Sequence, residues 1–371
     1  RLSRLGVLAS HANSDVSDRV FRIALPTTPP PVASRIRLEY DDATVGAHAG
    51  AALATADFNG DGRDDLLVGA PGDGATSPGR VLMFLGGGSP DPGATPDLVL
   101  TGLQAGETFG AAVANAGDVN GDGLDDIVVG APLNDAAGTD AGRAYVFYGG
   151  GTLDPSSDLT LTGATAGDHF GAAVAGGDIN RDGYADLLIG APMNDAAGTD
   201  AGRAYLYYGG RSPDPSSDLT LTGTAAGDHF GSAVAFTGKV RETGNFDEAV
   251  VDYFLVAAPL NDETGVDAGR VYGFAASAVP LATPKLSLGG HAPGEKFGTS
   301  VAPAGNVMGD GSVHFLVGVT LAGGVEPVDR PVGYVYATGG AGAGRALMGL
   351  VLPNTRSAAT QVAGAAAVNA P

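Results

Sequence analysis

Residues 170–192 read FGAAVAGGDINRDGYADLLIGAP, and three features follow one another in this stretch. A Phe-Gly pair opens a run of small residues, an Asp-rich loop comes next, and an apolar run ends in Gly-Ala-Pro. Further Phe-Gly pairs begin at Phe109, Phe230 and Phe297, so successive pairs are 61, 60 and 67 residues apart. Self-similarity at such a period is the signature of an architecture built from one repeated supersecondary unit.

Each repeat contains four short runs of strand-forming residues. In the repeat that starts at Phe170, two runs flank the Asp-rich loop, the third is GRAYLYY at 202–208, and the fourth is LTLT at 219–222. Gly, Pro, Asp or Asn bounds every run, which is typical of strands joined by tight turns, and helical periodicity is absent over any useful length. Four antiparallel strands per unit, repeated radially, predict an all-β protein with the blades of a β-propeller.

The repeats divide the chain into segments. We expect five full repeats, at approximately 49–101, 109–162, 170–222, 230–288 and 297–352, with partial blades at both ends: an outer strand near 36–40 and a cut-short blade at 360–371. The propeller then covers residues 36–371, and its ring is either incomplete or closes by pairing the two ends. Residues 28–35 are a Pro-rich linker. Residues 1–27 are either the tail of an upstream β domain or a disordered segment.

Composition and charge restrict the class of protein. The formal net charge is −21, which argues against a nucleic-acid partner because an acidic surface repels phosphate groups. The chain has no Cys, so disulfides and thiolate metal sites are excluded. No apolar run reaches the roughly 18 residues of a membrane span, and no signal peptide is visible. Since the chain starts at Arg1 without Met, we interpret it as a fragment or a processed product.

Three loops share the pattern Asp-x-Asn-x-Asp-Gly-x-x-Asp, at 57–65, 118–126 and 178–186. Oxygen ligands at alternate positions suit Ca²⁺, which takes 6–8 oxygens, whereas Mg²⁺ keeps its waters and demands a strict octahedron. Positions 1, 3, 5 and 9 supply side chains and position 7 a backbone carbonyl, so three calcium sites are expected. The expected ligands are Asp57, Asn59, Asp61, Arg63, Asp65, Asp118, Asn120, Asp122, Leu124, Asp126, Asp178, Asn180, Asp182, Tyr184 and Asp186.

Two alternatives compete with this interpretation. An EF-hand needs a Glu at position 12 and an outgoing helix, but position 12 is Val68, Val129 or Ile189 within an apolar β-run. Asx-rich turns without an ion are the second alternative, and the repulsion among three crowded carboxylates in each of three loops weighs against it. The last two repeats depart from the pattern at 238–242 and 306–314, where we expect weak calcium binding or none.

Phe-Gly, the Asp-rich loop and Gly-Ala-Pro about 20 residues later resemble the FG-GAP repeats of integrin α-subunit propellers, over roughly residues 36–352. The resemblance implies a propeller, commonly seven-bladed, with calcium in the loops between first and second strands and ligand bound on the opposite face. Related repeats occur in secreted and surface proteins, so an extracellular or cell-surface location is expected. The lack of Cys and the near-identity of adjacent repeats favour a bacterial secreted member.

On the face opposite the calcium loops, polar turn residues form a candidate surface for a protein or glycan partner. They are Asn134, Asp135, Asp140, Asp168, His169, Asn194, Asp195, Asp200, Asp228 and His229. Turn formation alone also explains Asn, Asp and Gly at such places, and a single His per blade is typical of a surface turn. No nucleophile elbow, phosphate loop or zinc helix is present, so an enzyme is not expected. We expect an adhesion, ligand-binding or scaffolding module, or alternatively the accessory propeller of a larger secreted hydrolase or lyase.

Overall fold

The fold is known from a computed structural model, in which every regular element of the described residues is a β-strand. The structure describes residues 20–22, 39–41, 47–72, 76–87, 95–151, 154–241, 250–275, 282–305, 314–320, 333–337 and 346–350. Among these residues no helix is long and apolar enough to cross a membrane. The expected all-β class is therefore confirmed.

Five sheets of four strands follow one another along the chain, and in each sheet neighbouring strands are consecutive and antiparallel. The first is β3 Ala52–Ala56, β4 Asp65–Ala70, β5 Arg80–Phe84 and β6 Leu98–Thr101. The second is β7 Ala112–Gly117, β8 Asp126–Ala131, β9 Arg143–Phe147 and β10 Leu159–Thr162. The third is β11 Ala173–Gly177, β12 Asp186–Ala191, β13 Arg203–Tyr207 and β14 Leu219–Thr222. The fourth is β15 Ala233–Arg241, β16 Val250–Ala258, β17 Arg270–Ala275 and β18 Leu286–Gly289. The fifth is β19 Val301–Gly305, β20 His314–Gly318, β21 Gly333–Ala337 and β22 Ala346–Leu350.

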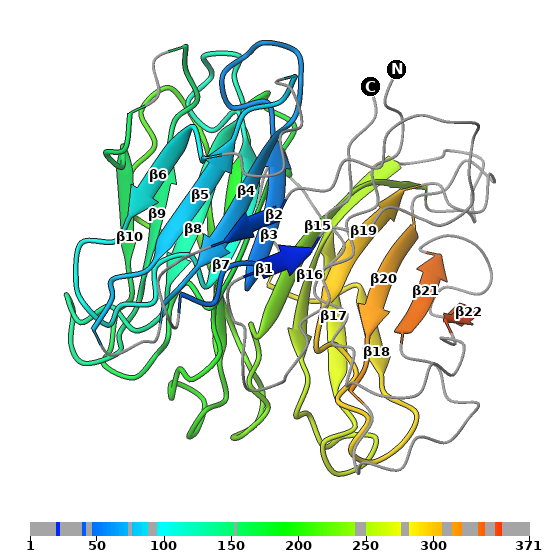
Figure 1. The fold of residues 1–371 in the computed structure, drawn as a ribbon. Coiled ribbons are helices and arrows are strands. Elements are labelled where there is room, and N and C mark those ends of the chain that lie inside the picture. The colour runs from blue at the N-terminus through cyan, green and yellow to red at the C-terminus, as the bar shows by residue number, and fades with distance from the viewer. Residues whose placement is uncertain are drawn as a thin grey trace.

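The sheets are the blades of a propeller, as the repeats predict. Figure 1 shows them standing side by side, from the blue sheet of β3 to the orange-red sheet of β22. The first strands of successive blades contact one another in the order β3, β7, β11, β15, β19. Residues from these first strands and the turns before them line one cavity of about 240 Å³, which marks a common axis. The lining residues include Ala52, Ala112, Ala173, Ala233 and Val301, because only small or short side chains fit where blades converge.

A smaller sheet precedes the first blade. Strand β1 Val20–Arg22 pairs antiparallel with β2 Glu39–Asp41, with Phe21 opposite Tyr40. The strand expected near 36–40 thus pairs with a segment expected to belong to an upstream domain or to be disordered. The partial blade expected at 360–371 lies outside the described residues.

Four of the hydrophobic core clusters lie between neighbouring blades, and a fifth, formed by Val68, Leu82 and Phe84, belongs to the first blade alone. The cluster between the first two blades joins Leu67 and Met83 of one to Ile127 and Phe147 of the other. Equivalent clusters separate the second from the third blade, the third from the fourth, and the fourth from the fifth. A sheet with two apolar faces must be covered on both, which explains why single repeats cannot fold alone.

The Phe of each Phe-Gly pair lies in the hydrophobic cluster between two neighbouring blades. Phe170 is 1% exposed and meets Tyr205 of its own blade edge-on, with ring centroids 5.4 Å apart. Backbone contacts explain the glycines, since Gly171 has φ 89° and a Cβ there would lie 2.2 Å from the carbonyl oxygen of Arg143 in the preceding blade. A Cβ at Gly130, in the preceding Gly-Ala-Pro, would lie 1.9 Å from the carbonyl oxygen of Gly171. The two motifs of the repeat are therefore the two sides of one close contact between blades.

The fourth blade is built differently at the Asp-rich loop. Its first two strands, β15 and β16, have nine residues each, and Lys239 to Arg241 pair with Asp252 to Val250. Residues 238–241, expected to have lost the ligands, thus continue a strand. The corresponding residues 306–313 of the fifth blade lie outside the described part of the chain.

Candidate metal centre and opposite face

Three hairpins join the first and second strands of the first three blades. We refer to residues 57–65, between β3 and β4, as hairpin 1, to residues 118–126, between β7 and β8, as hairpin 2, and to residues 178–186, between β11 and β12, as hairpin 3. No helix leaves any of them, so the described chain has no EF-hand at these loops. The shared sequence pattern therefore occupies the same structural position in three consecutive blades.

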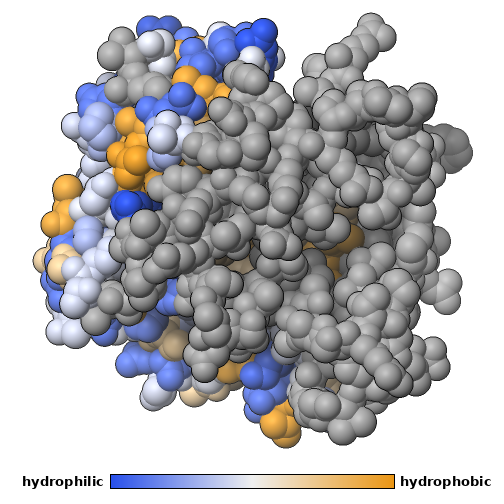
Figure 2. Space-filling view, viewed as in Figure 1, coloured by the Kyte–Doolittle hydropathy of each residue, from blue (hydrophilic) through white to orange (hydrophobic). Residues whose placement is uncertain are grey.

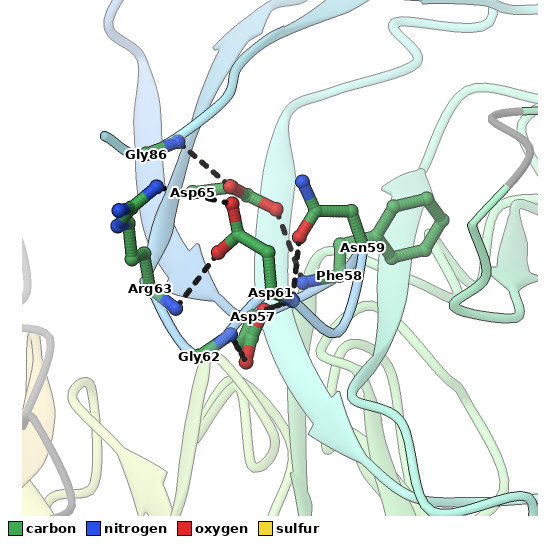
Figure 3. A network of polar contacts seen from close by, with 8 residues as sticks. All are labelled: Asp57, Phe58, Asn59, Asp61, Gly62, Arg63, Asp65 and Gly86. Carbon is green, nitrogen blue, oxygen red and sulfur yellow. Dashed lines mark hydrogen bonds and ion pairs between the residues drawn. The ribbon is translucent and has the colours of Figure 1, made fainter. Parts of the chain in front are cut away.

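Within each hairpin, side-chain oxygens accept hydrogen bonds from the backbone of the turn. In hairpin 1, Asp57 accepts from the N–H groups of Asp61 at 3.0 Å and Gly62 at 2.8 Å. Asn59 Oδ1 accepts from Asp61 N at 2.9 Å, and Asp61 Oδ1 accepts from Arg63 N at 2.9 Å. Figure 3 shows these side chains close together in the turn. The backbone of the turn thus folds around the side-chain oxygens of positions 1, 3 and 5.

The other two hairpins repeat this pattern. Asp118 accepts from Gly123 N at 2.8 Å and Asp178 accepts from Gly183 N at 3.2 Å. At position 3, Asn120 Oδ1 accepts from Asp122 N at 2.8 Å and Asn180 Oδ1 accepts from Asp182 N at 2.9 Å. The local turn geometry is therefore a property of the motif.

The Asp at position 9 is the first residue of each second strand and is buried. Asp126 is 0% exposed, and its two oxygens accept from Val119 N and from Gly149 N, each at 2.8 Å. Burial, and to a smaller extent the carboxylates of Asp122 and Asp118, raise its pKa to about 7. Burial and Asp182 raise the pKa of Asp186 to about 7 in the same way. Position 9 therefore joins the hairpin to the end of the third strand and carries a carboxylate that is costly to ionise.

The pKa of Asp65 is also raised by burial, with a smaller contribution from Asp61. Its oxygens accept from Phe58 N at 3.1 Å and Gly86 N at 2.8 Å. Hairpin 1 thus has the same buried carboxylate as the other two. All three hairpins thus place a carboxyl group where water is largely excluded.

The donor set of each hairpin suits a hard cation, since every side-chain donor is oxygen. As they stand, however, no three His, Cys, Asp or Glu side chains of the described residues form a group that could hold a metal ion. The bonds above give the reason, because the carboxylates at positions 1 and 5 are turned toward backbone N–H groups. The residue types fit a metal ion. In this structure, however, the carboxylates at positions 1 and 5 point toward the backbone of the turn.

The sequence pattern did not indicate contacts between hairpins. Asp125, at position 8 of hairpin 2, accepts a hydrogen bond through Oδ2 from Asp57 N of hairpin 1 at 3.2 Å. The same oxygen accepts from Asn115 Nδ2 at 2.8 Å. Position 8 was outside the expected ligand series, and its only sequence signal is an Asp in hairpins 1 and 2 that is Ala185 in hairpin 3.

Four of the candidate partner-facing residues are buried, which corrects their expected exposure. Asn134, Asp168, Asn194 and Asp228 are 1–3% exposed, so these side chains are not available to a partner. Their turn positions place them under the loops, where their polar groups bond to the protein itself. The residues that remain at least partly exposed are Asp135, Asp140, His169, Asp195, Asp200 and His229.

Two of these buried residues, Asn134 and Asp228, take part in similar polar contacts at blade junctions. At the first junction, Glu107 is 0% exposed and accepts hydrogen bonds from Asn134 Nδ2 and from Tyr145 Oη, the latter at 2.9 Å. Burial and the charge of Glu107 raise the pKa of Tyr145 to about 12. In a later blade, Asn261 Nδ2 donates to Asp228 Oδ2 at 2.8 Å. These groups stabilise the junction between blades and do not form an open site.

A family model described as the FG-GAP repeat matches residues 49–82, 109–147 and 170–207. The chain carries FG-GAP repeats. Each matched segment begins at the turn before a first strand and ends in the third strand of the same blade. The FG-GAP matches thus fall on the three blades that carry hairpins 1, 2 and 3.

Curated relatives share these repeats over part of their length. Integrin alpha-IIb of Mus musculus is 40% identical over 158 residues, which are 40% of this chain and 15% of that protein. Integrin alpha-PS2 of Drosophila melanogaster is 38% identical over 167 residues, which are 41% of this chain and 12% of that protein. Phosphatidylinositol-glycan-specific phospholipase D of Bos taurus is 29% identical over 287 residues, which are 71% of this chain and 33% of that protein. The chain thus spans a third or less of these relatives, which are all animal proteins, and the expected bacterial origin is not borne out.

Proposed function

We propose that this chain is a calcium-binding propeller module that works outside the cell or at its surface. The observation that carries the proposal is the recurrence of one hairpin in three consecutive blades, each with oxygen donors at positions 1, 3, 5 and 9 and a buried carboxylate at position 9. The similarity of the FG-GAP repeats to those of integrin α chains supports it. Three calcium ions are expected, one per hairpin.

In each hairpin the ion is held by the side chains at positions 1, 3, 5 and 9 and by the carbonyl of position 7. The carboxylates at positions 1 and 5 turn from backbone N–H groups toward the ion. A carboxylate oxygen has about two lone pairs, so position 9 keeps its backbone bonds while it binds calcium. Bound calcium supplies the positive charge that allows these carboxylates to stay ionised. The hairpins are therefore structural sites that fasten the first and second strands of a blade.

Calcium that binds only the folded state raises stability by mass action. We expect the melting temperature of the chain to fall in excess chelator and to recover on addition of Ca²⁺. Affinities near 10⁻⁴–10⁻³ M, about those of extracellular modules, would match the proposed location. A matched control replaces position 5 in every hairpin, as Asp61→Asn, Asp122→Asn and Asp182→Asn, because these residues are exposed and the Asn keeps the oxygen that bonds position 7. The control should lose the response to calcium, and an unchanged melt of the native chain in chelator would contradict the proposal.

We further propose that the face opposite the hairpins binds a protein or glycan partner. Asp135 and Asp195 are exposed in corresponding loops of the second and third blades, and both accept the backbone N–H of the residue five positions later. In Figure 2, hydrophilic residues with apolar patches between them cover the described part of the visible surface. Binding to protein and glycan arrays should weaken in the double variant Asp135→Asn and Asp195→Asn, which removes charge, keeps an oxygen for Asp140 N and Asp200 N, and loses the bond from Gln104 Nε2. Array binding that the double variant leaves unchanged would place the partner elsewhere.

A second candidate function is supported by the phospholipase D relative of Bos taurus, whose match covers 71% of this chain. In this alternative the chain is the accessory propeller of a larger secreted hydrolase or lyase. The propeller itself is non-catalytic in both proposals. Assay of the described chain alone against phosphatidylinositol-glycan should give no turnover, and the full parent protein should give turnover only under the alternative.

A further inference from the structure

Hairpins 1, 2 and 3 touch one another in series. Ala185 N, at position 8 of hairpin 3, donates to the carbonyl oxygen of Asp118, at position 1 of hairpin 2, at 2.7 Å. Between hairpins 2 and 1, position 8 and position 1 meet again, because Asp125 Oδ2 accepts from Asp57 N at 3.2 Å. A residue next to a proposed ligand in one hairpin thus bonds to the first ligand residue of the hairpin before it.

A glycine three residues after the end of the third strand adds a second link at each of these two junctions. Gly150 N donates to Phe58 O of hairpin 1 at 2.9 Å, and Gly210 N donates to Val119 O of hairpin 2 at 2.9 Å. The preceding glycine donates to the position-9 carboxylate of its own blade, as Gly149 N does to Asp126 Oδ1 at 2.8 Å. Two consecutive N–H groups therefore join the buried carboxylate of one hairpin to the backbone of the hairpin before it.

In each neighbouring pair, the position-7 side chain of the later hairpin lies against position 4 of the earlier hairpin. A Cβ added at Gly121, position 4 of hairpin 2, would lie 2.2 Å from Cε1 of Tyr184, position 7 of hairpin 3. A Cβ added at Gly60 of hairpin 1 would lie 2.5 Å from Cδ2 of Leu124, position 7 of hairpin 2. Gly123, at position 6, also has a positive φ but would meet nothing within 4 Å. A Cβ at position 4 would therefore displace a side chain of the neighbouring hairpin, in addition to straining its own backbone.

Hairpin 3 shows what happens where the series ends. Its position 4 is Arg181, a non-glycine residue with φ 62°. The next blade has no Asp-rich turn at 238–241, since β15 continues there as a strand. A side chain at position 4 therefore occurs in the hairpin that is not followed by another of its kind.

We propose that hairpins 1, 2 and 3 bind calcium cooperatively, with Leu124 and Tyr184 as the residues that couple each hairpin to the one before it. The inference rests on the proposed calcium-binding function. An ion in one hairpin fixes its positions 7 and 8, and the contacts of these residues order the backbone of the neighbouring hairpin. The next ion then binds a turn that is already ordered, so less conformational entropy is lost, and linkage makes the effect equal in both directions.

The test is hydrogen exchange of the native chain, read by mass spectrometry for peptides that cover each hairpin, over a range of free Ca²⁺. We expect all three hairpins to gain protection over one calcium range. In Tyr184→Ala the calcium midpoints of hairpins 2 and 3 should both rise, by at least about fivefold, the lower end of typical couplings between sites. Leu124→Ala should shift hairpins 1 and 2 by a similar factor. Both side chains are partly exposed, so these variants should fold.

Two control variants distinguish the loss of coupling between hairpins from a general loss of order in the hairpins. Tyr184→Phe keeps the ring over Gly121 and loses only the bond that Arg211 Nε makes to the hydroxyl at 3.2 Å, so its midpoints should match those of the native chain. Arg63→Ala removes the position-7 side chain of hairpin 1, and hairpins 2 and 3 should still gain protection together over one calcium range. If the hairpins of Tyr184→Ala and Leu124→Ala gained protection at the same calcium concentrations as those of the native chain, the proposed coupling would be wrong. The proposal of calcium binding would still stand. No protection of any hairpin at ~10 mM Ca²⁺, above the affinity range expected, would overturn both.

Discussion

At the residue scale, one acidic residue at each blade junction is buried beneath a turn. The length of its side chain decides which groups it can reach. Glu107 reaches the hydroxyl of Tyr145 at 2.9 Å. At the next junction the residue is Asp168, which accepts from Thr165 N at 3.1 Å, while the buried hydroxyl of Tyr205 lies near the Arg203 side chain and has no carboxylate partner among the described residues. One methylene group fewer thus leaves this hydroxyl without the carboxylate bond that Tyr145 makes.

We expect Asp168→Glu to stabilise the chain by about 1 kcal/mol, the usual net value of one hydrogen bond. The longer side chain can reach Tyr205 as Glu107 reaches Tyr145. The measurement is urea unfolding of the calcium-loaded chain. The gain should vanish in the double variant Asp168→Glu and Tyr205→Phe, which has no hydroxyl to satisfy. An equal gain in both variants would show that the hydrogen bond is not its cause.

Which polar turn residues are buried could not be predicted from the sequence. Asn134 and Asp135 are neighbours in one loop, and the first is 1% exposed whereas the second is exposed. Both residue types are favoured in turns, so local preference does not distinguish them. The difference arises from Glu107 of the loop that joins the blades, 27 residues away.

At the element scale, blades are fixed to one another by close backbone contacts as well as by side chains. The glycines of Phe-Gly and Gly-Ala-Pro meet across the junction, at Gly171 and Gly130. Both glycines are visible in the sequence as a recurring motif, and the contact that requires them appears only when two blades are placed side by side.

Gly171→Ala and Gly167→Ala form a matched pair that isolates this contact. Both positions have positive φ, 89° and 83°, but a Cβ at Gly167 would meet nothing within 4 Å. We expect Gly167→Ala to lower the free energy of unfolding by about 1 kcal/mol, because it strains the backbone. Gly171→Ala should lower it by at least about 2 kcal/mol more, because the added Cβ forces the two blades apart, as overpacking does in other cores. Thermal and urea unfolding measure both, and equal losses would show that the contact between blades is unimportant.

The number and kind of strands could be predicted for the repeats, because Gly, Pro and Asp mark their ends. The fourth blade shows the limit of this reasoning. Residues 238–241 were expected to have lost the ligands of the Asp-rich loop, and they pair with residues 250–253 as a continued strand. When the charged pattern is lost, local sequence does not reveal whether the turn remains or the ladder extends past it.

At the scale of the whole molecule, the buried carboxylates make the calcium-free protein sensitive to pH. Asp126 and Asp186 have pKa values raised to about 7, above the 3.8 usual for Asp. The folded state therefore binds more protons than the unfolded state between about pH 4 and 7. These two groups favour folding at low pH, and their contribution is lost as pH rises through 7.

We expect the chain in excess chelator to melt at a higher temperature at pH 6 than at pH 8. Saturating calcium should remove or reverse the difference, because the ion binds the ionised carboxylates and so lowers their pKa. The difference between the two pH values should shrink in the variant Asp126→Asn with Asp186→Asn, whatever its absolute stability. Equal melting temperatures of the native chain at pH 6 and pH 8 in chelator would contradict the raised pKa values.

The radial arrangement could be predicted from one repeated unit with apolar runs that need cover on both faces. What surrounds the axis could not, because the cavity depends on how five first strands converge. The contacts between hairpins were also missed, since Leu124 and Tyr184 look like ordinary turn residues until the neighbouring glycine is seen beneath them.

The most direct test of the account is the number of calcium ions bound by each chain. Equilibrium dialysis against radioactive Ca²⁺, up to ~10 mM to saturate sites of the expected affinity, counts them. Hairpins 1, 2 and 3 predict three ions per chain. Saturation at five, or no saturable binding, would contradict the assignment of the metal sites to these three hairpins.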